Sequence, residues 1–204
     1  NVETGFSRNV LHRANEAVDS VDFEAEAAKR EDFTNLPIFT IDSASTKDID
    51  DAIHIEKLEN GYRLGVHIAD VSFYVRGGTD SDSDAYKRGT SIYFGNNVIP
   101  MLPQIFSNDV CSLNEKSRRL AFSCVMDMDK DGNVTNYRFV KSLIYSRVKG
   151  VYSEINAILA GEADEKIKEK YAEVYDEIFL GKELYDILRK KHIRRGSMDI
   201  ESEE

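Results

Sequence analysis

Alternating apolar and polar positions predict β-strands through the middle of the chain. Residues 37–41, 52–58 and 62–70 are rich in β-branched and aromatic side chains, and such runs between turn residues are typical of strands. Asn60-Gly61 separates the second run from the third, a dipeptide that favours a tight hairpin. The pattern therefore predicts one strand that leads into a β-hairpin.

A second pair of apolar runs covers residues 120–128 and 134–148. Between them, Asp127, Asp129, Asp131 and Gly132 begin like a calcium-binding loop. Position 12 of such a loop requires a bidentate glutamate, and here it is Arg138. We therefore favour a second hairpin turn over a calcium module.

The pattern changes to helical at both ends of the chain. Residues 1–36 predict a helical lead-in, with Ser7 as the N-cap of the first helix. Residues 153–195 predict a short helix that stops at Gly161 and one longer helix after it. The fold class expected is α+β: a mixed or antiparallel sheet with hairpins over residues 37–150, followed by C-terminal helices. Residues 37–204 would form a single partial domain after the lead-in.

The segment between the two strand pairs is less regular. Gly, Ser and Asp residues over 77–84 predict a loop, and two prolines in 98–103 predict an irregular connection. Lys87 and Arg88 are candidates for holding a phosphate group. Tyr93 ends a short apolar run, where it is a candidate for stacking on a base or an ordinary core residue.

Composition limits the function classes. The chain has 204 residues and a net charge of −10, and no apolar run approaches the roughly 18 residues that a membrane span needs. The first residues show no signal-peptide pattern, so we expect a cytoplasmic protein with no membrane partner. Cys111 and Cys124 lack metal-site spacing and are expected to be reduced thiols. The acidic balance disfavours a nucleic-acid surface unless an acidic metal site accounts for part of it.

The densest chemistry lies at Asp42, Asp48, Asp50 and Asp51, four carboxylates within ten residues. Two carboxylates about 5 Å apart repel by roughly 3 kcal/mol at an effective dielectric near 20. A hard divalent cation such as Mg²⁺ would turn that repulsion into shared attraction, whereas a solvated acidic turn would leave the charges apart. Predicted strands hold both ends of the stretch, which favours the metal site. Asp70 follows the next strand and either joins the cluster or, as we favour, caps the following turn.

Several segments together resemble the catalytic domain of the ribonuclease II and ribonuclease R exoribonucleases. They are Asp42-Ser-Ala-Ser-Thr-Lys-Asp48-Ile-Asp50-Asp51-Ala52, Val66-His-Ile-Ala-Asp-Val-Ser72, Arg88-Gly-Thr-Ser-Ile-Tyr93, Ile99-Pro-Met-Leu-Pro103, Cys111-Ser-Leu113 and Arg195-Gly196. The resemblance implies a Mg²⁺-dependent hydrolase that shortens single-stranded RNA from its 3′ end and releases nucleoside 5′-monophosphates.

The same resemblance implies residue roles. Asp42, Asp48, Asp50 and Asp51 match the family's catalytic, metal-binding aspartates, and Tyr93 matches the tyrosine that stacks on the 3′-terminal base. A later Ser-Pro-Ile-Arg-type block of the family has no counterpart here, so we expect a fragment with little activity alone. Cold-shock-like and S1-like domains are expected to flank it in the parent protein. A non-catalytic RNA-binding or scaffolding relative is the alternative.

Overall fold

The computed structural model describes residues 4–95 and 97–197 of the chain. Its strands are β1 (Glu31–Asp32), β2 (Ile38–Asp42), β3 (Asp51–Leu58), β4 (Gly61–Ala69), β5 (Ile92–Phe94), β6 (Asn97–Ile99), β7 (Arg118–Asp129) and β8 (Val134–Val151). Its helices are α1 (Arg8–Asp19), α2 (Phe23–Ala27), α3 (Val71–Tyr74), α4 (Asp80–Arg88), the π-helix η1 (Ile105–Val110), α5 (Tyr152–Ala160), α6 (Glu165–Lys170), the 3₁₀-helix η2 (Ala172–Val174) and α7 (Tyr175–Arg194). The expected combination of a mixed sheet with C-terminal helices is confirmed.

The long strand β8 closes the main sheet into a ring. Its first part pairs antiparallel with β7, and its last residues pair parallel with β2. The antiparallel pairs β2–β3, β3–β4 and β4–β7 complete the circuit. The short strand β1 pairs parallel with β8 on the same edge as β2. Because the ring is closed through β8, the ends of β2, β3, β4 and β7 are fixed relative to one another.

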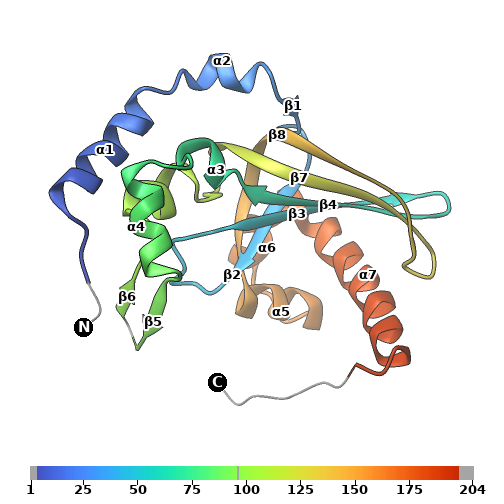
Figure 1. The fold of residues 1–204 in the computed structure, drawn as a ribbon. Coiled ribbons are helices and arrows are strands. Elements are labelled where there is room, and N and C mark those ends of the chain that lie inside the picture. Colours follow the sequence, from blue (N-terminus) through green and yellow to red (C-terminus); the bar gives the residue numbers. More distant parts are fainter. Residues whose placement is uncertain (1–3, 96, 198–204) are drawn as a thin grey trace.

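Figure 1 shows helices α1 and α2 on one side of this sheet and helices α5 and α7 on the other. A hydrophobic core lies on each side. The first contains Ala52 and Ile144 from the strands and Ala14, Ala27 and Phe33 from the N-terminal segment. The second lies between the sheet and helices α5 to α7, and it buries the following side chains most completely: Tyr171, Val174, Phe39, Ile158 and Tyr62. The lead-in expected over residues 1–36 therefore packs against the sheet and adds strand β1 to it.

Both predicted hairpins are present. The first turns at Glu59-Asn60, one residue earlier than Asn60-Gly61, and Gly61 begins β4 opposite Asp129. A Cβ at Gly61 would lie 1.8 Å from the Met128 carbonyl oxygen, so only glycine fits there. In the second hairpin, the Asp129 carboxylate accepts hydrogen bonds from the backbone of Asp131 and from Asn133. These bonds confirm a turn in place of a calcium loop.

Three expectations about local structure are wrong. Residues 80–84, expected in a loop, begin helix α4, because Thr79 caps its N-terminus and Asp80 and Asp82 suit the positive end of the helix. Asp70 makes no side-chain cap of α3; its carboxylate forms a buried ion pair with Arg30, at 2.8 Å between Oδ2 and Nη2. The single long C-terminal helix is divided into α6, η2 and α7. No helix in the described residues is both long and apolar enough to cross a membrane.

Candidate active site

The acidic stretch forms a loop between two strands of the ring. Asp42 is the last residue of β2, Asp51 is the first residue of β3, and residues 43–50 between them lie outside regular secondary structure. Because β2 and β3 are antiparallel neighbours, the end of one strand and the start of the next lie at the same edge of the sheet. The sheet therefore holds the two outer aspartates of the stretch, as the sequence predicted.

Asp42 is the most constrained of the four. Its Oδ2 atom is buried and accepts no hydrogen bond from the described residues, and the nearby Thr40 hydroxyl is also without a partner. Burial raises the pKa of Asp42. The nearby Thr40 hydroxyl lowers it even though the two groups are not in hydrogen-bonding geometry, and repulsion from Asp51 and then Asp48 raises it further. A buried carboxylate oxygen without a partner is costly, and a cation would relieve that cost.

Asp50 is influenced by the same group of charges. The residue is solvent-exposed, yet partial desolvation by nearby protein atoms raises its pKa, and repulsion from Asp48, Asp51 and Asp42 raises it further. The four carboxylates therefore influence one another electrostatically. However, among residues 4–95 and 97–197 no three acidic, histidine or cysteine side chains are grouped closely enough to hold a metal ion. The assignment of metal ligands among the four stays a prediction.

Tyr93 contacts the acidic loop directly. Its hydroxyl donates a short hydrogen bond to Asp48 Oδ2, and this bond, with burial, raises the pKa of Tyr93 to about 12. The Tyr93 side chain lies on the β5–β6 hairpin and is 62% exposed. The core-packing alternative is therefore wrong, and the ring is accessible to a ligand.

A cleft of about 620 Å³ lies beside this contact. One wall is the acidic loop with Asp48, and a second is the β5–β6 hairpin with Tyr93. The third consists of Gln104, Ser107 and Asn108, around helix η1. These three polar residues were not predicted as part of the site, because the apolar, proline-broken stretch before them gives no sign of a π-helix. π-Helical turns occur frequently at functional sites.

Lys149 braces the first half of the acidic loop. It lies on β8 opposite Thr40 of β2, and its ammonium group donates to the carbonyl oxygens of Ala44 at 3.1 Å and Thr46 at 2.5 Å. The same charge favours the ionised form of Asp42. The acidic loop is thus tied to the sheet at a point where the sequence showed only an ordinary strand residue.

Lys87 and Arg88 differ in their availability. Both lie in the last turn of α4, and Lys87 is exposed. The Arg88 guanidinium pairs with Asp84 at 2.6 Å, donates to the Gly5 carbonyl and lies over the Phe6 ring. A phosphate contact from Arg88 would have to compete with these partners, whereas Lys87 is open to solvent.

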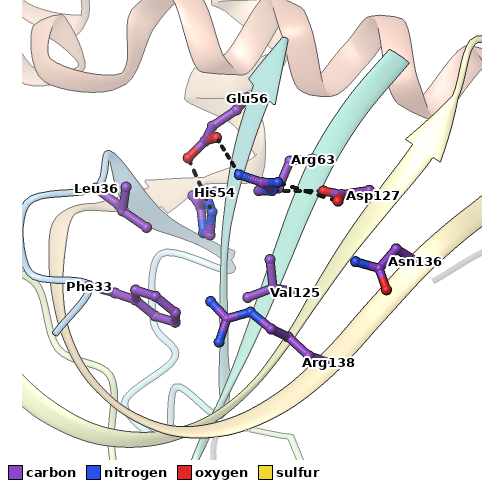
Figure 2. A pocket seen from close by; sticks show the side chains of 9 residues that line it. All are labelled: Phe33, Leu36, His54, Glu56, Arg63, Val125, Asp127, Asn136 and Arg138. Atoms are coloured by element: carbon purple, nitrogen blue, oxygen red, sulfur yellow. Dashed lines mark hydrogen bonds and ion pairs between the residues drawn. The ribbon is translucent and has the colours of Figure 1, made fainter. Parts of the chain in front are cut away.

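A second pocket, of about 270 Å³, lies at the opposite end of strands β3, β4 and β7 (Figure 2). Its charged side chains all have partners: Arg63 forms an ion pair with Asp127 at 2.7 Å and lies 3.6 Å from Glu56, and Arg138 pairs with Glu31 just outside the pocket. At its floor, His54 Nδ1 lies 2.8 Å from His67 Nε2, and His67 Nδ1 lies 2.7 Å from Ser123 Oγ. This pocket is remote from the acidic loop, and its internal pairing makes it a poor candidate for the active site.

Comparison with known proteins identifies the family. The sequence model of the RNB domain family matches residues 30–204. The chain belongs to the RNB domain family. A curated relative, ribonuclease R 1 of Lactococcus lactis, is 44% identical over 200 residues, which are 98% of this chain and 24% of the relative. The chain thus spans about a quarter of that relative's length.

Solved structures give the same result for the fold. RNase R of Mycoplasma genitalium in complex with ribose-methylated single-stranded RNA matches with a TM-score of 0.90 and 30% identity, over 100% of this chain and 31% of that one. Yeast Ssd1, described as a pseudonuclease, matches with a TM-score of 0.61 and 23% identity, over 69% of this chain and 18% of that one. The second likeness concerns the fold alone, so catalysis has to be argued from the site.

Proposed function

We propose that this chain carries the catalytic aspartates of a Mg²⁺-dependent exoribonuclease that hydrolyses single-stranded RNA in the 3′-to-5′ direction and releases nucleoside 5′-monophosphates. Membership of the RNB family and the likeness to ribonuclease R support the reaction class. The observation that carries the proposal is the acidic loop: Asp42 and Asp51 are held by the strands at its two ends, Asp42 has a buried oxygen without a partner among the described residues, and Asp48 lines an open cleft.

The donor set suits Mg²⁺. Hard divalent cations prefer carboxylate oxygens, and Asp42 and Asp51 are anchored by the strands on either side. We propose that these two ligate the ion directly and that Asp48 and Asp50 complete the site by ligation or by hydrogen bonds to ligated water. When bound, Mg²⁺ would activate water and stabilise the charge that develops on the phosphodiester.

The cleft would receive the 3′ end of the RNA. The accessible Tyr93 ring offers a stacking surface for the terminal base, a contact available to every base. The bond from Tyr93 to Asp48 places that ring beside the acidic loop, so a stacked nucleotide would present its phosphate near the carboxylates. The exposed Lys87, in the last turn of α4, would contact a phosphate group of the RNA. Cold-shock-like and S1-like flanking domains stay a prediction from the family resemblance.

The test is a digest of 5′-labelled oligo-A by the chain and by a version extended past Glu204, with Mg²⁺ and with EDTA. With Mg²⁺ we expect the extended version to give a ladder that shortens from the 3′ end and nucleoside 5′-monophosphate products, and the chain alone to give little product. We expect no cleavage in EDTA. Asp50→Asn should abolish turnover while RNA affinity stays within about twofold, because stacking does not involve that carboxylate. Internal cleavage, or full activity of the Asp50→Asn variant, would refute the proposal.

A non-catalytic RNA-binding relative is the second candidate, because Ssd1 shows that a protein described as a pseudonuclease shares the fold. The four intact aspartates argue against this alternative here. A ligand that binds only the folded state raises the melting temperature. A melting temperature unaffected by Mg²⁺, with RNA binding retained, would therefore favour the non-catalytic candidate.

A further inference from the structure

One buried serine outside the acidic loop binds the second half of that loop at two points. Ser112 Oγ accepts a hydrogen bond from the Ile49 backbone N–H at 3.1 Å and donates one to the Lys47 carbonyl at 2.8 Å. The backbone N–H of Leu113 donates to the Ile49 carbonyl at 2.9 Å. Asp48 therefore lies between two peptide groups that share a single hydroxyl.

The serine is itself rigidly placed. Ser112 is 1% exposed and its neighbour Leu113 is fully buried, while Arg119 Nε donates to the Ser112 carbonyl at 2.9 Å. Ile49, on the other side of the contact, is also 1% exposed and belongs to the first core. The contact between Ser112 and Ile49 therefore joins two well-packed segments, and neither segment can move without disturbing the packing of the core.

The same segment also contacts the cleft wall formed by η1. Asn114 Nδ2 donates to the carbonyl of Asn108 in η1 at 3.2 Å, and Asn108 lines the same cleft as Asp48. Residues 112–114 thus connect the carboxylates to the wall that would face the RNA. A shift in this segment would alter both the spacing of the aspartates and the width of the cleft.

We propose that Ser112 is the positioning residue of the metal site: it holds the backbone on both sides of Asp48 and next to Asp50, and thereby sets the affinity for Mg²⁺ without contacting the ion. This inference rests on the proposed function. Groups that orient metal ligands typically change metal affinity by about 10- to 100-fold when removed. The carboxylates of Asp48 and Asp50 depend on this support because residues 43–50 have no strand or helix of their own.

The test compares Ser112→Ala with Ser142→Ala in the same chain. Both serines are almost fully buried and each loses one hydroxyl, but Ser142 hydrogen-bonds Ser123 far from the acidic loop. Mn²⁺ binding is followed by electron paramagnetic resonance, with Mg²⁺ as competitor. We expect Ser112→Ala to raise the Mg²⁺ Kd about 10- to 100-fold, and Ser142→Ala to change it by less than about twofold. RNA affinity in EDTA should be unchanged in both.

A second variant guards against misfolding. Ser112→Cys fills nearly the same space, but its thiol is a weak donor and acceptor, so a folded chain with an Mg²⁺ Kd raised at least about fivefold is expected. If either folded Ser112 variant binds Mg²⁺ as tightly as the wild type, the positioning role is overturned while the proposed function survives. If the wild type itself binds no Mn²⁺, both proposals fail.

Discussion

The hydroxyl of Tyr93 donates a hydrogen bond to the carboxylate of Asp48. One side chain thus combines an exposed aromatic face with a polar end that fixes a member of the acidic loop. In the proposed reaction, this hydrogen bond would hold the stacked terminal base at a fixed distance from the carboxylates. The ring and the hydroxyl have separate roles, stacking and hydrogen bonding, which substitutions can distinguish.

Tyr93→Ala should weaken binding of labelled oligo-A, because the stacking surface is lost. Base–aromatic stacking contributes about 1–3 kcal/mol per base, so a Kd increase of roughly 5- to 150-fold is expected in fluorescence anisotropy. Tyr93→Phe keeps the ring and should stay within about twofold. Tyr185→Ala removes a similarly exposed tyrosine from α7 and serves as the control. Equal effects of the two alanine variants would contradict the stacking role.

Lys149→Met should raise the pKa of Asp42. That pKa is already raised by burial, and the Lys149 charge is among the groups that lower it. Removing the charge also releases the carbonyls of Ala44 and Thr46. Carboxyl carbon chemical shifts followed through a pH titration measure the effect directly. Lys141→Met changes an exposed lysine of the same strand and should leave the titration of Asp42 unchanged. Similar titration curves for the two variants would show that Lys149 does not influence Asp42.

Gly65→Ala should destabilise the fold where Gly181→Ala does not. A Cβ at Gly65 would lie 2.0 Å from His54 Cε1, whereas a Cβ at Gly181 would meet Ile55 Cδ1 at an ordinary 3.4 Å. Overpacking costs typically about 1–3 kcal/mol, while alanine in place of a mid-helix glycine stabilises by up to about 1 kcal/mol. Urea unfolding of the two variants should therefore shift the midpoint in opposite directions. A stable Gly65→Ala variant would mean that His54 does not pack on that strand.

The stability of the chain should fall as the pH drops below 6.5. Burial, followed by the Arg63 charge, lowers the pKa of His54 to about 4, and burial, followed by His54, lowers that of His67 to about 3. Their unfolded pKa values are near 6.5, so the unfolded chain binds these protons first. The stabilisation is complete above pH 6.5 and is lost progressively towards pH 3–4, by roughly 1 kcal/mol per histidine at pH 5.5.

Urea unfolding at pH 7 and pH 5.5 measures this loss. His67→Gln should reduce the difference between the two free energies of unfolding by about half. The exposed His12 has a side chain that is 70% accessible, so His12→Gln should retain the wild-type difference. An unchanged difference in the His67→Gln variant would show that the pair does not remain neutral in the fold.

The strands and hairpins could be predicted because their signals are local. Alternation marked β3, β4, β7 and β8, and the Asn60-Gly61 and Asp131-Gly132 turns marked their connections. The closure of the sheet was not visible, because the pairing of β8 with β2 joins residues more than a hundred positions apart. Helix α4 was missed because its polar first turn reads as a loop until Thr79 is recognised as its cap.

The candidate site could be located from the sequence, but its support could not. The four aspartates and Tyr93 lie in motifs that can be read directly. Ser112 and Lys149 act through hydrogen bonds to loop carbonyls, and a backbone carbonyl carries no sequence signature. The polar wall formed by Gln104, Ser107 and Asn108 depends on an irregular helix and was likewise invisible.

The most direct test of the metal site is a titration of the ¹⁵N-labelled chain with substoichiometric Mn²⁺, followed by paramagnetic broadening of the amide signals. If the acidic loop binds the ion, the amides of residues 42–51 broaden first, that broadening is reversed by excess Mg²⁺, and Asp42→Asn weakens it. Broadening that starts at residues 127–133, or that is uniform over the surface, would contradict a cation site in this loop.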